Sequence, residues 1–398
     1  MIAAGGSSAR VATSADPFDA GPYARLQIAL GLTGPGTSRV ARRALVVATI
    51  AWLPLAVLAA LEGLALRADP RESMLLDVAA HARYLVATPL FVLAEVACLP
   101  RLAMIAHHFR AAGIIQDADS SKYESVLDST RRLLASQRAE LIIVAVAFAT
   151  TIALGRVWYP VTMSTWVAPI AGGVRTVSYA GWWRTLVSQP LFAVLLLMWL
   201  WRLVVWALFL WRVSHLRLRL VASHPDLNGG LAFVAGSLRA FPLFAFAFTA
   251  PMAGGSANGL LYGSEQLLTF GYVVAGAVTV VLLMCAAPLL VFFTPLLRLH
   301  VRGVFEYGQL AGEVGRRFEE RWILPGKTID TSALAAPDFS ATTDLYSVVA
   351  NVRAMRLVPL DVRDVVPILI AALLPFVPVL LVTVPVQQVL EAILKLLR

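Results

Sequence analysis

Seven long apolar runs constrain this chain more than any other feature of its sequence. A helix needs about 20 predominantly apolar residues to cross the roughly 30 Å hydrocarbon core of a bilayer. Backbone polar groups in hydrocarbon have no water to bind, so each run must satisfy its hydrogen bonds as a helix. The sequence therefore predicts an all-α polytopic membrane helix bundle of about seven transmembrane helices, at 43–66, 84–106, 141–159, 186–211, 231–253, 270–297 and 365–386.

The composition agrees with a membrane protein and narrows its partners. Of the 398 residues 59% are hydrophobic and 14% are charged, whereas about 25% are charged in soluble chains. This balance excludes a soluble enzyme as the main body of the protein. The net charge of +9 would favour nucleic acid in a soluble domain, but basic and acidic residues balance in the longest loop. We therefore expect the lipid bilayer, and no nucleic acid, as a partner.

The positions of Lys and Arg predict the orientation and the domain limits. Basic residues gather in the N-terminal tail and in 107–139, 212–219 and 298–364, and such loops stay in the cytoplasm. We expect a bacterial cytoplasmic (inner) membrane with the N-terminus in the cytoplasm. Residues 1–42, rich in Gly, Ser, Ala and Pro, are predicted to form a poorly ordered tail. Residues 43–398 form the bundle, including cytoplasmic helical loops 107–139 and 298–364.

The sequence does not decide how the last apolar run passes through the membrane. It contains Pro375, Pro378 and Pro385, and proline interrupts the hydrogen bonds of a helix interior. The run fits either a broken span or a re-entrant hairpin.

Three charged residues fall inside predicted spans. Each costs about 2.5–3.5 kcal/mol at the bilayer centre on insertion scales, and such residues usually face a bundle interior or water. Glu95, Arg202 and Arg239 lie at depths compatible with one shared layer. The cluster is interpreted either as a polar pathway or as a structural ion pair that holds three helices together.

Two tryptophans share the helical face of Arg202. Trp199 and Trp206 lie three and four residues from it, which places the three side chains on one side of a helix. A cation–π contact with Arg202 is compatible with this spacing. The pattern predicts either an aromatic lining of the bundle interior or bulky side chains that face lipid.

The turn before the fifth run reads His-Pro-Asp-Leu-Asn-Gly-Gly. Pro and Gly specify a tight turn, and Asp or Asn can cap the helix that follows. The alternative is a small anion site at a helix N-terminus. The residues concerned are His224, Asp226, Asn228, Gly229 and Gly230.

An apolar stripe continues past the sixth run. Its members recur every three or four residues, so one helix presents them on one face. Two interpretations compete: the stripe packs against the other cytoplasmic helix, in the loop 107–139, or it is a subunit contact in a homo-oligomer. The stripe consists of Val304, Tyr307, Ala311, Val314, Phe318 and Trp322.

Motifs for catalysis, metals or cofactors are missing from the sequence. Hydrolase, phosphate-loop, dinucleotide and zinc patterns do not occur, and Cys98 and Cys285 lie in apolar runs. We therefore expect no enzyme activity, no cofactor and no metal site. A lipid-modifying enzyme would have His224 and Asp226 as its nameable groups.

Three stretches of the second half resemble a known family. They are His224-Pro-Asp226 with Gly229-Gly230-Leu231, then Glu306-Tyr-Gly308-Gln-Leu310-Ala311 with Phe318 and Trp322, then Val348-Val349 through Met355-Arg356 to Pro359. Together they resemble a family of uncharacterised bacterial multi-pass inner-membrane proteins. The resemblance implies membrane location and no particular activity.

The charges inside spans and the proline-broken runs favour a channel or transporter for a small ion or polar solute. In that hypothesis Glu95, Arg202 and Arg239 line or gate the path. The alternative is a non-transporting membrane scaffold that binds partner proteins through its cytoplasmic helices.

Overall fold

The structure is a bundle of α-helices, as predicted. The computed structural model describes residues 37–158, 166–171, 174–263, 265–323 and 337–383. A short β-hairpin pairs β1 (Ile170–Ala171) with β2 (Val174–Arg175). Most of the predicted tail, 1–36, lies outside the described residues, and the prediction was wrong for 37–42, which already belong to a helix.

Among the described helices, four are long and apolar enough to cross a membrane, or up to seven if each of three bent pairs is one span. By length and composition the protein is thus a membrane protein. The four continuous ones are α2 (Thr37–Leu61), α3–η3–α4 (Val78–His81, Ala82–Ala87, Thr88–Ala111), α7–η5–α8 (Tyr179–Trp183, Arg184–Ser188, Gln189–Ser214) and α11–η7–α12 (Leu267–Ala286, Ala287–Phe292, Phe293–Trp322).

The remaining three predicted spans belong to helix pairs that are bent at a break. The bends are 41° between α5 (Ser120–Leu134) and α6 (Gln137–Trp158), 43° between α9–η6 (Ala232–Ala235, Leu238–Ala240) and α10 (Pro242–Leu261), and 48° between α14 (Val362–Leu373) and α15 (Phe376–Thr383). Two bends coincide with proline. Pro242 starts α10 and Pro375 separates α14 from α15, because proline is tolerated at a helix start and disrupts its interior.

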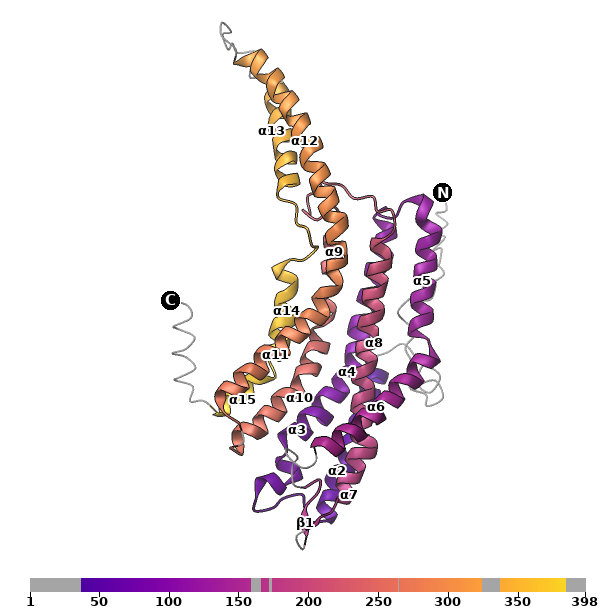
Figure 1. The fold of residues 1–398 in the computed structure, drawn as a ribbon, viewed down its shortest axis with the longest axis vertical. Coiled ribbons are helices and arrows are strands. Elements are labelled where there is room, and N and C mark those ends of the chain that lie inside the picture. The colour runs from indigo at the N-terminus through magenta and orange to yellow at the C-terminus, as the bar shows by residue number, and fades with distance from the viewer. Residues whose placement is uncertain (1–36, 159–165, 172–173, 264, 324–336, 384–398) are drawn as a thin grey trace, which may run out of the picture.

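The helices form two packed groups (Figure 1). In one group α2 packs on α4 and α6 packs on α8, and in the other α10 contacts α11, α14 and α15. Helices α12 and α13 (Pro337–Arg353) pair and extend beyond the bundle. We call this the α12–α13 end, and the opposite one the β1–β2 end. Short helical turns complete the described fold: η1 (Pro70–Glu72), η2 (Met74–Leu76) and η4 (Asp117–Asp119).

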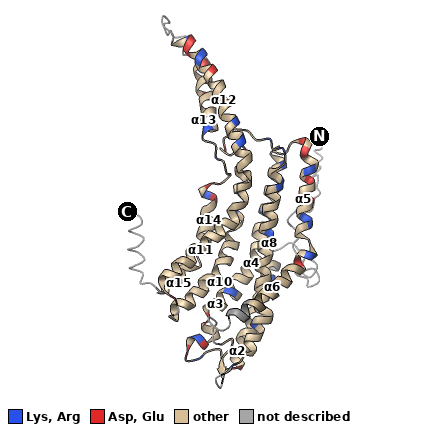
Figure 2. Ribbon diagram, viewed as in Figure 1, with Lys and Arg blue, Asp and Glu red and all other residues tan. Residues whose placement is uncertain are grey.

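The charged residues are distributed unevenly over the helices. Charged residues concentrate on α5, α12 and α13, whereas α11 and α15 carry none (Figure 2). Large apolar side chains such as Leu45, Leu141 and Leu268 are exposed on the bundle surface. Exposed apolar area on this scale is unfavourable in water and expected against lipid.

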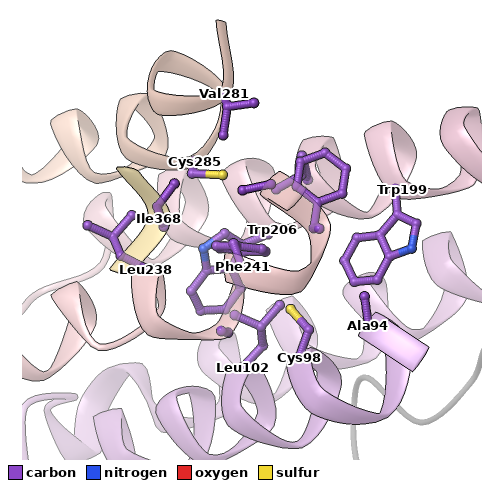
Figure 3. Packing of buried hydrophobic residues seen from close by; sticks show 14 of the residues in the cluster. Ala94, Cys98, Leu102, Trp199, Trp206, Leu238, Phe241, Val281, Cys285 and Ile368 are labelled. Atoms are coloured by element: carbon purple, nitrogen blue, oxygen red, sulfur yellow. The ribbon is translucent and has the colours of Figure 1, made fainter. Parts of the chain in front are cut away.

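The core joins the two helix groups. Figure 3 shows Trp206 and Phe241 in its middle, with Cys98 and Leu102 of α4 on one side and Cys285 of α11 on the other. Both cysteines are fully buried and free. Protein interiors are packed as densely as organic crystals, so the two helix groups are in close contact in this region.

Candidate functional site

Glu95 is the centre of a charged cluster inside the bundle. Its Oε1 accepts a hydrogen bond from Nη2 of Arg202 at 2.6 Å, and its Oε2 accepts one from Nη2 of Arg43. The three side chains come from α4, α8 and α2, and we call them the charge triad. Arg202 is only 5% exposed. Both carboxylate oxygens are engaged, so the triad ties three helices together.

Arg239 does not join this cluster. Its Nε donates to Oδ1 of Asp364 at 2.5 Å, in the first turn of α14. Arg239 lies in η6, directly before the bend at which the long helix α10 starts with Pro242.

Arg43 is the member of the triad that sequence reasoning missed. Arg43 is the first residue of the first predicted span, and a basic residue at that position usually marks the headgroup level. In the structure α2 begins at Thr37, which places Arg43 nearly two turns inside the helix. No sequence signal pairs it with Glu95, because the two are 52 residues apart.

The two tryptophans are core residues. Trp199 donates through Nε1 to the carbonyl of Phe91 at 2.9 Å, and the guanidinium carbon of Arg202 lies 5.2 Å from its ring centroid. Trp206 stacks on Phe209 with ring centroids 5.4 Å apart. The predicted face is therefore confirmed as an interior one, filled by aromatic rings.

Asp226 organises the turn that the sequence singled out. Its Oδ1 accepts from the backbone N–H of Asn228 at 2.9 Å and of Gly230 at 3.1 Å. Its Oδ2 accepts from the N–H of Ala232, the first residue of α9, at 3.0 Å. Gly229 and Gly230 have φ of +64° and +96°, a left-handed conformation that glycine adopts without strain. Asp226 thus binds the first N–H of α9 from the preceding turn, whereas the N-cap position itself is Leu231, which makes no side-chain cap hydrogen bond.

These bonds change the acidity of Asp226. Partial burial by itself raises the pKa of the carboxyl, but the N–H groups of Asn228, Ala232 and Gly230, together with His224, hold the pKa below its usual range. The N–H groups favour the ionised form because a carboxylate accepts hydrogen bonds better than a carboxylic acid.

A pH-dependent loosening of this turn follows. A lowered folded-state pKa means that ionised Asp226 stabilises the turn fully above the unfolded pKa of about 3.9. That stabilisation is lost as the pH falls through the lower folded-state value. We expect amide hydrogen exchange at 228–232, normalised to intrinsic rates, to rise at low pH. Asp226→Asn should exchange fast already at neutral pH; wild-type protection in that variant would contradict the prediction.

The three stretches behind the family resemblance meet at this turn. The N–H of Arg356 donates to the carbonyl of Leu227 at 2.7 Å. The hydroxyls of Ser223 and Tyr307 lie 3.1 Å apart. A Cβ added at Gly229 would come within 2.8 Å of the Leu299 side chain, so the turn packs closely on α12.

A pocket of about 510 Å³ opens beside the turn. We call it the turn pocket. Its charged lining balances three arginines against three aspartates, and Arg356 lies 2.8 Å from Asp361. No described acidic side chain forms an ion pair with Arg363. The pocket is lined by Pro225, Asp226, Leu227, Asn228, Ala232, Phe233, Ala235, Gly236, Arg239, Arg356, Leu360, Asp361, Arg363 and Asp364.

Asn228 is the most unusual residue of this lining. It is 4% exposed, and its Nδ2 donates to the carbonyl of Asp226 at 3.0 Å. Its Oδ1 has no hydrogen-bond partner among the described residues. A buried acceptor without a donor costs about 1–3 kcal/mol, so this oxygen would gain from a ligand that donates an N–H or O–H.

The apolar stripe on α12 is occupied by the chain's own α13. Phe339 packs edge-on against Phe318, with ring centroids 4.9 Å apart, and lies 5.3 Å from Trp322. Val304 and Tyr307 pack against the bundle core, and Ala311 and Val314 are half-buried. The stripe is therefore covered within the chain, but by α13 and not by the helix of the loop 107–139 that was predicted to cover it. A homo-oligomer through these residues stays a prediction.

Within the described residues, no group of three or more His, Cys, Asp and Glu side chains could hold a metal ion. No family model matches the chain, and neither a curated protein nor a solved structure matches it.

Proposed function

We propose that this protein is a membrane transporter or channel for a small ion or polar solute, and that the turn pocket is its solute-binding site. The proposal rests on the position of the turn pocket in the fold. It lies where two bent spans, α9–α10 and α14–α15, both begin. Transporters commonly bind solutes where helices are discontinuous, because backbone groups and helix ends are available there.

The lining supports a charged or zwitterionic solute. Arg363 forms no ion pair among the described residues and is available for an anionic group, and Oδ1 of Asn228 lacks a hydrogen-bond donor. The carboxylates of Asp361 and Asp364 are already paired with Arg356 and Arg239. The charge triad has a different role in this proposal. With both Glu95 oxygens bound by guanidinium groups, it holds the helices that surround the path.

Flux measurements test the proposal. Full-length protein in liposomes is assayed with labelled chloride, phosphate, potassium, glycine and glutamate. We expect uptake of at least one probe, reduced about tenfold in Arg363→Gln, since a charge-assisted hydrogen bond contributes about 1.5–3 kcal/mol. Arg316→Gln, on the exposed part of α12, is the matched control. Absence of flux for every probe counts against transport, and equal flux in both variants removes the pocket from the path.

A scaffold is the second candidate, and the extended pair α12–α13 favours it. Phe305 is 74% exposed and Ile323 is 66% exposed on α12, so this helix offers apolar contacts to a partner protein. The scaffold hypothesis gains support if the flux assay is negative and a second protein co-purifies at fixed stoichiometry that is lost in Phe305→Ser.

A further inference from the structure

A second pocket, of about 700 Å³, opens between the end of α8 and the first half of α12. We call it the lateral pocket. It shares no lining residue with the turn pocket. Its walls come from the last turn of α8, the extended segment after it, and η7 with α12. The lining consists of Trp211, Ser214, His215, Leu216, Leu218, Leu220, Leu290, Val291, Thr294, Pro295, Arg298, Leu299 and Arg302.

The α12 side of the lateral pocket changes from apolar to basic along its length. Thr294, Arg298 and Arg302 follow one another at intervals of four residues in α12, so they lie in a row on one face. Leu290, in the 3-10 helix η7 that precedes α12, lines the same pocket about two turns before Arg298. A ligand that fills this side of the pocket is apolar at one end and anionic at the other.

The extended segment that forms the facing wall turns apolar side chains to the pocket. Leu216, Leu218 and Leu220 line the pocket, whereas the intervening Arg217 and Arg219 are exposed. This alternation is that of an extended segment, and Leu218 forms a β-bridge with Ile115. Trp211 is 50% exposed at the end of α8, and half-exposed tryptophans are typical of the membrane–water interface.

The electrostatics of the lateral pocket differ from those of the turn pocket. None of its lining residues is acidic. No described carboxylate forms a salt bridge with Arg298, and Arg302 lies 3.5 Å from Glu306 with both side chains mostly exposed. Exposed pairs of this kind are weak and easily exchanged. The pocket is therefore positively charged at its polar end.

We propose that the lateral pocket binds an anionic phospholipid. The acyl chain lies against Leu290, Val291 and the leucines of the facing wall, and the phosphate lies against Arg298 and Arg302. Basic pockets between transmembrane helices commonly hold such headgroups. A soluble phosphate compound has no group that would fill the apolar half of the pocket. A zwitterionic lipid gains less than an anionic one from two arginines whose one acidic partner, Glu306, is weakly held.

Lipid titration of the full-length protein in detergent tests the proposal. Bound dioleoyl phosphatidylglycerol is counted by native mass spectrometry, with phosphatidylcholine and glycerol 1-phosphate as comparison ligands. In Arg298→Ala/Arg302→Ala we expect phosphatidylglycerol affinity to fall about 30-fold, about fivefold for each arginine. The matched control, Arg316→Ala/Arg317→Ala, removes two charges from the exposed part of the same helix and should retain wild-type affinity.

A second variant tests the apolar half and keeps the test valid if the double variant misfolds. Thr294→Trp fills the pocket between Leu290 and Arg298 without changing charge. We expect it to weaken phosphatidylglycerol binding. The proposal would be overturned if the two double arginine variants lost phosphatidylglycerol affinity equally. It would also be overturned if the wild-type protein bound phosphatidylcholine as tightly as phosphatidylglycerol. Glycerol 1-phosphate that binds as tightly as the lipid would assign the site to a free phosphate instead.

Discussion

Replacing Glu95 with alanine is expected to destabilise the protein by about 3–5 kcal/mol, because it leaves two guanidinium groups without their counter-ion in a medium of low dielectric constant. Arg202 is almost completely buried and Arg43 is 14% exposed. The free energy of unfolding in mixed micelles, followed by circular dichroism during a dodecyl sulfate titration, measures the effect.

The chain offers a close control for this experiment. Glu313 also binds two arginines, Arg316 at 2.6 Å and Arg317 at 3.0 Å, but on the exposed part of α12. Glu313→Ala should leave stability unchanged within error, since exposed ion pairs contribute little. Glu95→Leu combined with Arg43→Met and Arg202→Met should recover most of the lost stability. If Glu95→Ala and Glu313→Ala are equally stable, the triad does not hold the helices.

Trp206→Ala is expected to cost about 3–5 kcal/mol, the usual range for truncating a fully buried large aromatic side chain. Trp206 is 0% exposed, and the rings and aliphatic side chains around it cannot close the space that its indole would leave. The same titration measures the change. Trp182, 52% exposed in α7, is the matched control, and Trp182→Ala should be close to wild type.

This variant also separates the two roles that the sequence left open for the tryptophan face. A side chain that lines a water-filled path can be truncated at little cost to stability, and its loss widens the path. Wild-type stability of Trp206→Ala together with faster solute leak from proteoliposomes would therefore assign Trp206 to a lining and contradict its role in the core.

Only some parts of the candidate site could be predicted from the sequence. The turn from His224 to Gly230 and the bond of Asp226 to the first N–H of α9 follow from local chemistry, because the carboxylate binds N–H groups at most six residues away. The turn pocket itself could not be predicted. It needs Arg239, Arg356 and Asp364, which come from other segments, and the distances between such segments have no local signal.

For the charged residues inside the spans, the sequence likewise predicts burial but not the complete set of partners. Burial of Glu95 and Arg202 is a consequence of their place in apolar runs, and their pairing follows from the cost of an isolated charge. The third member of the cluster depends on where each helix starts. Arg43 lies inside α2 and binds Glu95, whereas Arg239 lies before α10 and binds Asp364 instead.

The apolar runs were enough to predict a helical membrane protein with up to seven spans, and they indicated which side chains are too polar to face lipid. Hydrocarbon imposes these properties residue by residue, because every backbone group must be bonded within its own helix. The pairing of the charges, the positions of the bends and the contact of α13 with the stripe on α12 became known from the packed structure alone. These depend on helix registers and crossings, which are set by packing among residues distant in sequence.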